Sequence, residues 1–129
     1  MISSWFVSDL CLDRQDASTK HIVQAVGSSS KEKGNAFVEK HCASQKPTVY
    51  DSYASVYNDP NTDIIYVGTP HVCHKENTLD AIAAGKHVLC EKPIALNAKD
   101  AREMRDAAKA KGVFLMEGLS MPTFIIPEC

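Results

Sequence analysis

The sequence lacks several features that would place it in a special class of protein. Its 129 residues carry 14 Lys and Arg against 16 Asp and Glu, so a net charge of -2 offers no basic surface for nucleic acid or anionic lipid. No apolar run is long enough to span a bilayer, and the first residues lack the basic-then-apolar pattern of a secretion leader. No Asn-x-Ser/Thr sequon occurs. We therefore expect no nucleic-acid partner and no membrane partner.

Cysteine usage argues against a disulfide framework. The chain has 5 cysteines, an odd number, and no C-x-x-C pair occurs. They are spread along the whole sequence, at Cys11, Cys42, Cys73, Cys90 and Cys129. Disulfide-rich secreted domains use an even number of cysteines, whereas reduced thiols are usual inside cells. We therefore expect free thiols in a cytoplasmic protein.

The sequence does contain a regular alternation of β-rich and helical segments. With 44% hydrophobic and 23% charged residues, it has the composition of one globular domain. Runs of β-branched and aromatic residues predict strands at residues 21–27, 48–50, 63–68, 87–91 and 113–117. Helical segments are predicted at residues 31–41, just after 52, from the 69–71 loop to about 84, and at 98–111. Strand–helix alternation with short links indicates parallel βαβ units, so the fold class is α/β.

The predicted helices carry recognisable capping residues. Ser30, Ser52 and Asn97 each precede a helical segment, where a side-chain oxygen can accept a hydrogen bond from a free backbone N–H. Gly85 and Gly112 follow two of the segments and suit the left-handed conformation that often ends a helix. The helix boundaries are therefore predicted at these positions.

In open parallel sheets, ligands bind outside the carboxyl ends of the strands, so these ends are the candidate sites. The first end follows Gly27 and offers Ser28, Ser30 and Lys33 but no acidic residue directly after the glycine. Hydroxyls, backbone donors and a lysine suit a 2′-phosphate, whereas an acidic residue there would bind free ribose hydroxyls. On local sequence alone, a plain serine-rich turn before a capped helix explains the segment equally well.

The second strand end is the segment 68–74. Gly68 lets backbone approach a ligand, and Pro70 stiffens the turn into the next helix. The side chains of His71, Cys73 and His74 also raise the hypothesis of a metal site. Zinc sites normally use paired ligands at recurring spacing, and no second pair is present, so the sequence disfavours a metal.

The third strand end is Glu91-Lys92-Pro93. The proline excludes the helical conformation at Lys92 and fixes the direction in which the chain leaves the strand. A lysine flanked by a carboxylate at a strand end can donate a proton or polarise a substrate oxygen. Taken in isolation, these residues favour the alternative of a surface Glu–Lys pair that ends a strand.

Together, these segments resemble the Gfo/Idh/MocA oxidoreductase family, and within it the branch of dimeric dihydrodiol dehydrogenases and NADP-dependent D-xylose dehydrogenases. The resemblance covers about residues 2–119, with residues 2–10 similar to the first helix and Phe114–Gly118 to the last Rossmann strand. It is carried by the runs 63–71 with His74, 84–93, and 97–98; the run A-G-K-H-V-L-C-E-K-P is the most specific.

The resemblance implies a Rossmann-type parallel sheet with flanking helices, and hydride transfer between a sugar or diol C–OH and the nicotinamide of NADP, with NAD as a possible substitute. It assigns Lys92 as the catalytic residue, with Glu91 and Pro93 holding it beside the nicotinamide. The residues implied to line the nicotinamide side are Thr69, Pro70, His71 and His74; those implied at the 2′-phosphate are Ser28, Ser30 and Lys33. Ser29 departs from the family, where an arginine is common, so phosphate selectivity is weakened or shifted to Lys33.

The same resemblance predicts that parts of the family fold are missing. The first strand and its G-x-G turn would precede Ile2, and the C-terminal substrate domain would follow residue 119. We therefore expect a partial NAD(P)-binding Rossmann domain at residues 1–119 and a divergent tail at 120–129. The missing strand is central in the order 3-2-1-4-5-6, so the remaining strands should fall into two groups.

A chain of this kind is expected to be inactive alone. A homodimer like those of the family is possible, although its usual interface domain is missing. The alternative hypothesis is a non-catalytic nucleotide-binding or regulatory fragment.

Overall fold

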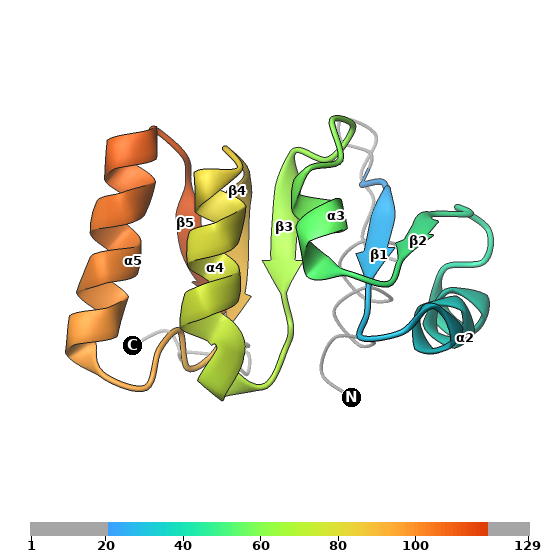
Figure 1. Cartoon of the computed structure of the whole chain (residues 1–129), viewed down its shortest axis with the longest axis horizontal. Coiled ribbons are helices and arrows are strands. Elements are labelled where there is room, and N and C mark those ends of the chain that lie inside the picture. Colours follow the sequence, from blue (N-terminus) through green and yellow to red (C-terminus); the bar gives the residue numbers. More distant parts are fainter. Residues whose placement is uncertain (1–20, 119–129) are drawn as a thin grey trace, which may run out of the picture.

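The computed structural model describes residues 21–118, and these form an α/β structure (Figure 1). The segments at residues 2–10 and 120–129 lie outside this range. Its strands are β1 Ala25–Gly27, β2 Thr48–Tyr50, β3 Ile64–Val67, β4 His87–Glu91 and β5 Leu115–Gly118. Its helices are α2 Lys31–His41, α3 Tyr53–Tyr57, the 3-10 turn η2 His71–Cys73, α4 His74–Ala83 and α5 Ala98–Lys111. None of these helices is long and apolar enough to cross a membrane.

The strands form two separate parallel groups. β1 pairs with β2, and β3, β4 and β5 pair in that order. Within residues 21–118, no hydrogen-bonded ladder joins β1 to β3. In Figure 1 the short helix α3, which packs against β1 and α4, lies across the space between β3 and β1. The predicted division of the strands into two groups is therefore confirmed.

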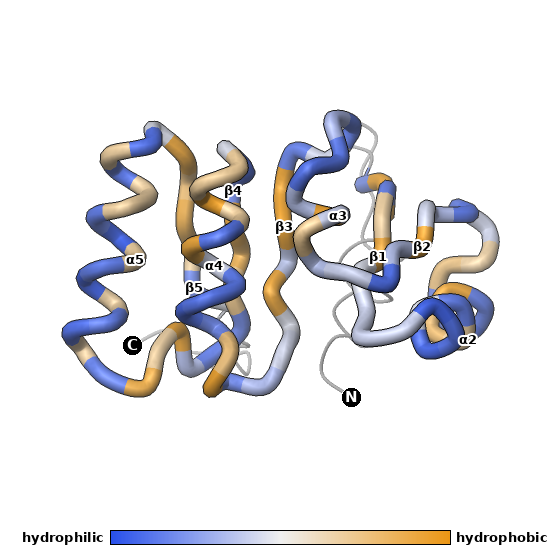
Figure 2. Tube along the Cα trace, in the orientation of Figure 1, coloured by the Kyte–Doolittle hydropathy of each residue, from blue (hydrophilic) through white to orange (hydrophobic). Residues whose placement is uncertain are grey.

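One face of the β3-β4-β5 group carries the core. Successive strand residues point to opposite faces, so Ile65, Val67 and Val88 turn toward α4 and α5 and are buried. The opposite face is partly exposed: Ile64 is 60% and Met116 52% accessible. In Figure 2, β3 is mostly hydrophobic with one paler segment, whereas α5 alternates between hydrophilic and hydrophobic residues, as a helix with one buried face should.

The predicted helix caps are confirmed. The side-chain oxygens of Ser30, Ser52 and Asn97 accept hydrogen bonds from backbone N–H groups three residues later. Gly85 and Gly112 adopt φ of 80° and 74°, the left-handed region that glycine enters without a steric cost. Local sequence therefore determines where these helices begin and end.

Three strands differ from their predicted bounds: β3 is shorter by one residue at each end, whereas β1 and β5 begin later than predicted. β1 begins only at Ala25, because the N–H of Val23 donates to the side-chain Oε1 of Gln45 at 2.6 Å instead of to a neighbouring strand. β5 begins at Leu115, because the N–H of Val113 bonds to the carbonyl oxygen of Ala108 at the end of α5. In both cases, side-chain or helix-end acceptors replace ladder partners.

A lysine joins the start of β4 to the turn before β3. The Nζ of Lys86 donates to the carbonyl oxygens of Asp59 and Thr62, each at 2.7 Å. The buried carboxylate of Asp59 in turn accepts from the hydroxyl of Tyr50 at 3.3 Å. This network fixes the end of the connection from β2 to β3, and hence the position of the strand that leads into the candidate site.

Candidate functional site

The segments that follow β3 and β4 leave the same edge of the sheet. Val67 is in register with Cys90, so the loop Gly68–Pro70 and the turn Glu91–Pro93 start side by side. Parallel strands place their carboxyl ends together, and this is where ligands bind in open α/β sheets. Two of the predicted site segments are therefore brought together by the fold.

His74, the first residue of α4, connects these two segments from inside. It is only 1% exposed, and its Nδ1 and Nε2 lie 2.8 Å from the carbonyl oxygens of Pro93 and Thr69 respectively. The two nitrogens of the buried imidazole thus face the carbonyl oxygens of the two predicted site segments.

The same contacts bear on the metal hypothesis. Both nitrogens of His74 are directed at backbone oxygens, and His71 lies exposed in η2. Across the described residues 21–118, no group of three or more His, Cys, Asp or Glu side chains is placed to hold a metal ion.

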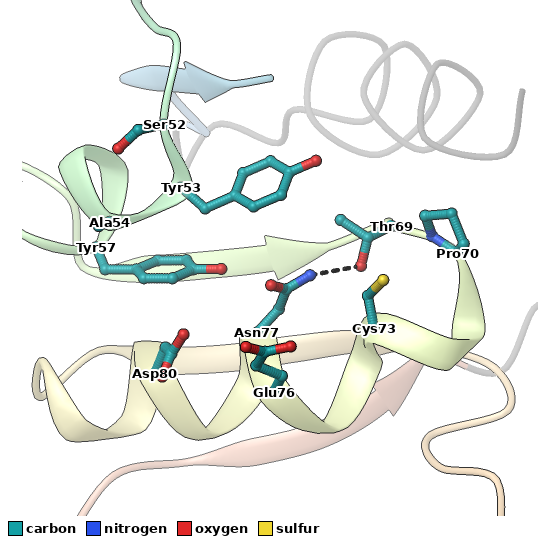
Figure 3. A pocket seen from close by; sticks show the side chains of 10 residues that line it. All are labelled: Ser52, Tyr53, Ala54, Tyr57, Thr69, Pro70, Cys73, Glu76, Asn77 and Asp80. Carbon is teal, nitrogen blue, oxygen red and sulfur yellow. Dashed lines mark hydrogen bonds between the residues drawn. The ribbon is translucent and has the colours of Figure 1, made fainter. Parts of the chain in front are cut away.

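A pocket lies between α3 and α4, beside the loop that follows β3 (Figure 3). Its volume is about 460 Å³, and its lining residues are Ser52, Tyr53, Ala54, Tyr57, Thr69, Pro70, Cys73, Glu76, Asn77 and Asp80. The buried amide of Asn77 donates from Nδ2 to Oγ1 of Thr69 at 2.9 Å, as Figure 3 shows. Asn77 therefore fixes the orientation of the Thr69 side chain in the loop that follows β3.

The pocket is acidic on its α4 side. Burial, followed by the negative charges of Asp80 and Glu76 and the nearby phenol of Tyr53, raises the pKa of Tyr57 to about 12. Its hydroxyl therefore stays protonated at neutral pH and is available as a hydrogen-bond donor.

The carboxylate of Glu91 holds the turn that carries Lys92. Glu91 is 9% exposed; its Oε1 accepts from the hydroxyl of Tyr66 at 2.6 Å, and its Oε2 accepts from the backbone N–H of Lys92 at 3.2 Å. The Lys92–Pro93 peptide bond is cis. Lys92 itself is exposed, so its side chain is accessible while its backbone is held.

Glu117 of β5 holds the other side of the same turn. Its Oε1 accepts from the backbone N–H of Ile94 at 2.8 Å. With His74 on the carbonyl of Pro93, three side chains from β4, β5 and α4 hydrogen-bond to consecutive parts of the turn.

The end of β1 presents hydroxyls and one lysine. The Nζ of Lys33 lies 3.4 Å from Oγ of Ser29, and Ser30 caps α2 by accepting from the N–H of Lys33. The N–H of Ser28 donates to the carbonyl oxygen of Tyr50 at 3.1 Å, which continues the pairing of β1 with β2. The lysine and serine side chains are therefore adjacent at this strand end.

A larger cavity, of about 1010 Å³, separates β1 from β3. Its described lining includes Ser28, Ser29 and Lys33 on one side and the Gly68–Pro70 loop with Asn77 on the other. Lys92, His71 and His74 are not among the described residues that line it. The cavity therefore brings together the first two predicted strand ends, while Lys92 lies outside it.

The sequence interpretation did not identify three residues that the structure places at the site: Tyr66, Asn77 and Glu117. In the sequence, each of the three is marked only as a polar side chain within an apolar or regular segment. Tyr66 interrupts the apolar run of β3, and Glu117 stands near the end of β5.

Comparisons with known proteins agree with this geometry. Residues 6–119 match the family described as "Oxidoreductase family, NAD-binding Rossmann fold". A trans-1,2-dihydrobenzene-1,2-diol dehydrogenase from Sus scrofa is 40% identical over 119 residues, which are 92% of this chain and 34% of the relative. A D-xylose 1-dehydrogenase (NADP(+)) from Hypocrea jecorina is 40% identical over 122 residues, covering 92% of this chain and 31% of that protein. The chain thus spans about a third of the length of these relatives.

Solved structures show the same likeness. KijD10, a 3-ketoreductase from Actinomadura kijaniata in complex with NADP, has a TM-score of 0.74 at 28% identity, covering 87% of this chain and 34% of that chain. An NAD binding oxidoreductase from Klebsiella pneumoniae has a TM-score of 0.66 at 32% identity, covering 90% of this chain and 28% of that chain. The chain belongs to the oxidoreductase family with the NAD-binding Rossmann fold.

Proposed function

We propose that the chain is the nucleotide-binding part of an NADP-dependent dehydrogenase acting on a sugar or diol. The parent reaction moves a hydride between a C–OH carbon and the nicotinamide. The observation that carries the proposal is the cavity that joins the end of β1 to the loop after β3. Relatives named for D-xylose and for a trans-dihydrodiol supply the substrate class.

The residues at the end of β1 fit a phosphorylated cofactor. Ser28, Ser29 and Lys33 line the cavity with hydroxyls and one positive charge, and among the lining residues that the structure describes at this strand end there is no carboxylate. Glu32 is charged, since a backbone hydrogen bond and the Ser30 hydroxyl lower its pKa, but it is not a described lining residue. A phosphate bound here gains a charge-assisted contact from Lys33, whereas two neutral ribose hydroxyls gain less. We therefore place NADP ahead of NAD.

The residues at the other two strand ends are proposed to contact the nicotinamide end of the cofactor and to transfer the proton. Thr69 and Pro70 line both pockets and are proposed to contact the cofactor near its nicotinamide end. His71 is proposed to extend the same lining, while His74 acts from beneath, through Thr69 and Pro93. NADP supplies the hydride acceptor. The exposed Nζ of Lys92 gives or takes the proton at the substrate oxygen, and Glu91 and Pro93 fix its backbone.

The proposal also covers the location, the partners and the domain boundaries of the protein. The described thiols of Cys42, Cys73 and Cys90 are free, which supports a reducing, cytoplasmic location. The proposed partner is a small sugar or diol molecule. The domain boundaries proposed are residues 1–119 for the nucleotide-binding part and 120–129 for the tail. A homodimer of the whole protein belongs to the same proposal.

The test is a fluorescence titration of the chain with NADPH and with NADH. Tighter binding of NADPH is expected, and Lys33→Met should weaken NADPH by about tenfold while leaving NADH nearly unchanged, because one charge-assisted contact is lost. Lys109→Met, at the far end of α5, serves as the control for loss of a lysine charge. Tighter binding of NADH, or an equal loss for both cofactors in Lys33→Met, would contradict the proposed cofactor choice.

A further inference from the structure

We propose that Tyr66 and Glu117 are positioning residues that fix the backbone on the two sides of Lys92, from opposite faces of the sheet. The role of Lys92 itself rests on the proposed function. The hydrogen bonds that carry the inference involve only described residues and do not depend on any bound molecule.

The register of β3 and β4 brings Tyr66 and Glu91 together. Tyr66 is paired with Leu89, so Glu91 lies two residues further along β4 on the same face of the sheet. A long aromatic side chain reaches such a diagonal neighbour, and the hydroxyl of Tyr66 meets Oε1 of Glu91 at 2.6 Å. This length is typical of a hydroxyl that donates to a charged carboxylate.

The two oxygens of Glu91 connect Tyr66 to Lys92. One oxygen accepts from the tyrosine and the other from the N–H of Lys92, so the plane of the carboxylate is set by both partners. Glu91 is only 9% exposed, and a charged carboxylate removed from water requires such donors. Without the phenol hydroxyl, the carboxylate turns toward another donor or toward water, and the N–H of Lys92 loses its acceptor.

Glu117 acts on the opposite face. It is paired with Cys90, whose neighbour along β4 is Glu91, and consecutive strand residues point to opposite faces. Its Oε1 accepts from the N–H of Ile94, two residues after Lys92. The turn is therefore held on one face through Tyr66 and Glu91 and on the other through Glu117, while the Lys92 side chain remains accessible.

The test measures amide hydrogen exchange by NMR in the 129-residue chain. Val88, whose N–H bonds to the carbonyl of Phe114 in the same sheet, reports opening of the sheet as a whole. Tyr66→Phe should speed exchange at Lys92 by about tenfold relative to Val88, the effect of losing one hydrogen bond. Glu117→Ala should do the same at Ile94, and Glu117→Gln, which keeps the accepting oxygen, should restore the slow exchange.

The matched control is Tyr50→Phe. It removes a tyrosine hydroxyl from a buried carboxylate, that of Asp59, outside the site. It should leave the ratio of Lys92 to Val88 exchange unchanged. Should Tyr66→Phe not fold, Glu91→Gln replaces it, because it weakens the same contact while keeping the side-chain shape; its Lys92 exchange should also rise relative to Val88.

A second readout separates positioning from cofactor binding. NADPH affinity is titrated in Tyr66→Phe and in Glu117→Gln beside the exchange ratios, because Tyr66 also lines the cavity between β1 and β3. An unchanged Lys92-to-Val88 ratio in Tyr66→Phe, failed rescue by Glu117→Gln, or an equal rise in Tyr50→Phe would overturn the inference. If the original chain bound no NADPH, the proposed function would fail, but the exchange ratios would still decide the positioning roles.

Discussion

The imidazole of His74 lies 2.8 Å from the carbonyl oxygen of Pro93, across the space between α4 and the turn that carries Lys92. Its other nitrogen lies 2.8 Å from the carbonyl oxygen of Thr69. One buried side chain thus links the loop after β3 to the turn after β4, although these segments are separated by more than a whole helix in sequence. The relative placement of the two strand ends depends on this residue.

His74→Leu should destabilise the chain and weaken cofactor binding together. The change fills a similar space but leaves two backbone carbonyls without their partner, a loss of about 2–4 kcal/mol in the free energy of unfolding. Chemical denaturation and NADPH titration measure the two effects. His41→Leu, on α2 away from the site, is the control. Full NADPH affinity in His74→Leu would show that the link is only structural.

Lys92→Met tests proton transfer in a completed chain, in which this sequence replaces the matching third of the Sus scrofa relative. We expect kcat to fall by ~10²–10⁴-fold, the usual contribution of general acid–base assistance, with little change in NADP affinity. Steady-state kinetics measure both, and Lys99→Met, an exposed lysine of α5, is the control. Near-normal turnover would support the alternative interpretation, in which Lys92 belongs only to a surface Glu–Lys pair.

The space between β1 and β3 predicts that the 129-residue chain gains stability from an added strand. The inner edges of the two strand groups are not joined by a ladder within the described residues, and such edges favour aggregation or rearranged pairing. Adding an apolar strand with a G-x-G turn ahead of Met1 should raise Tm by at least ~5 °C and sharpen the melt. An added Gly/Ser segment of equal length is the control. Equal melts for both additions would contradict the expectation.

The ion pairs between α4 and α5 predict a loss of stability in acid. The Nζ of Lys75 lies 2.8 Å from the carboxylates of both Asp100 and Glu103. The hydrogen bond from Lys75, the largest cause, lowers the pKa of Asp100 below its ordinary value of 3.8. The contribution of the ionised Asp100 carboxylate to stability is therefore fully present above pH 3.8, and it is lost as the pH falls through the lowered pKa of the folded state.

Asp100→Asn should remove this part of the acid dependence. The free energies of unfolding of the original chain and of Asp100→Asn, measured by denaturation between neutral and acidic pH, should converge at the lowest pH that still permits folding. Asp106→Asn, whose carboxylate is exposed beside Arg105, should leave the pH profile unchanged. A parallel displacement of the Asp100→Asn profile at every pH would show that the shifted pKa does not contribute.

Local features of the fold were predictable from the sequence, whereas contacts between distant segments were not. The caps at Ser30 and Asn97 depend on residues three positions away, so the sequence pattern was sufficient to predict them. The shortened β1 was not, because it depends on Gln45, 22 residues from Val23. For the site, the sequence singled out the strand ends, but the role of Tyr66 follows from the register of β3 against β4. The inward direction of His74 likewise depends on contacts with the carbonyl oxygens of Thr69 and Pro93, which the sequence pattern does not reveal.

The most direct test of the proposed function compares dehydrogenase turnover of the 129-residue chain with that of the completed chain. The substrates are D-xylose and a trans-dihydrodiol, each with NADP, and NADPH formation is followed by absorbance. The 129-residue chain should bind NADPH without turnover, because it spans about a third of its relatives, and the completed chain should oxidise at least one substrate. Turnover by the 129-residue chain, or a folded, NADPH-binding completed chain that oxidises neither substrate, would contradict the account.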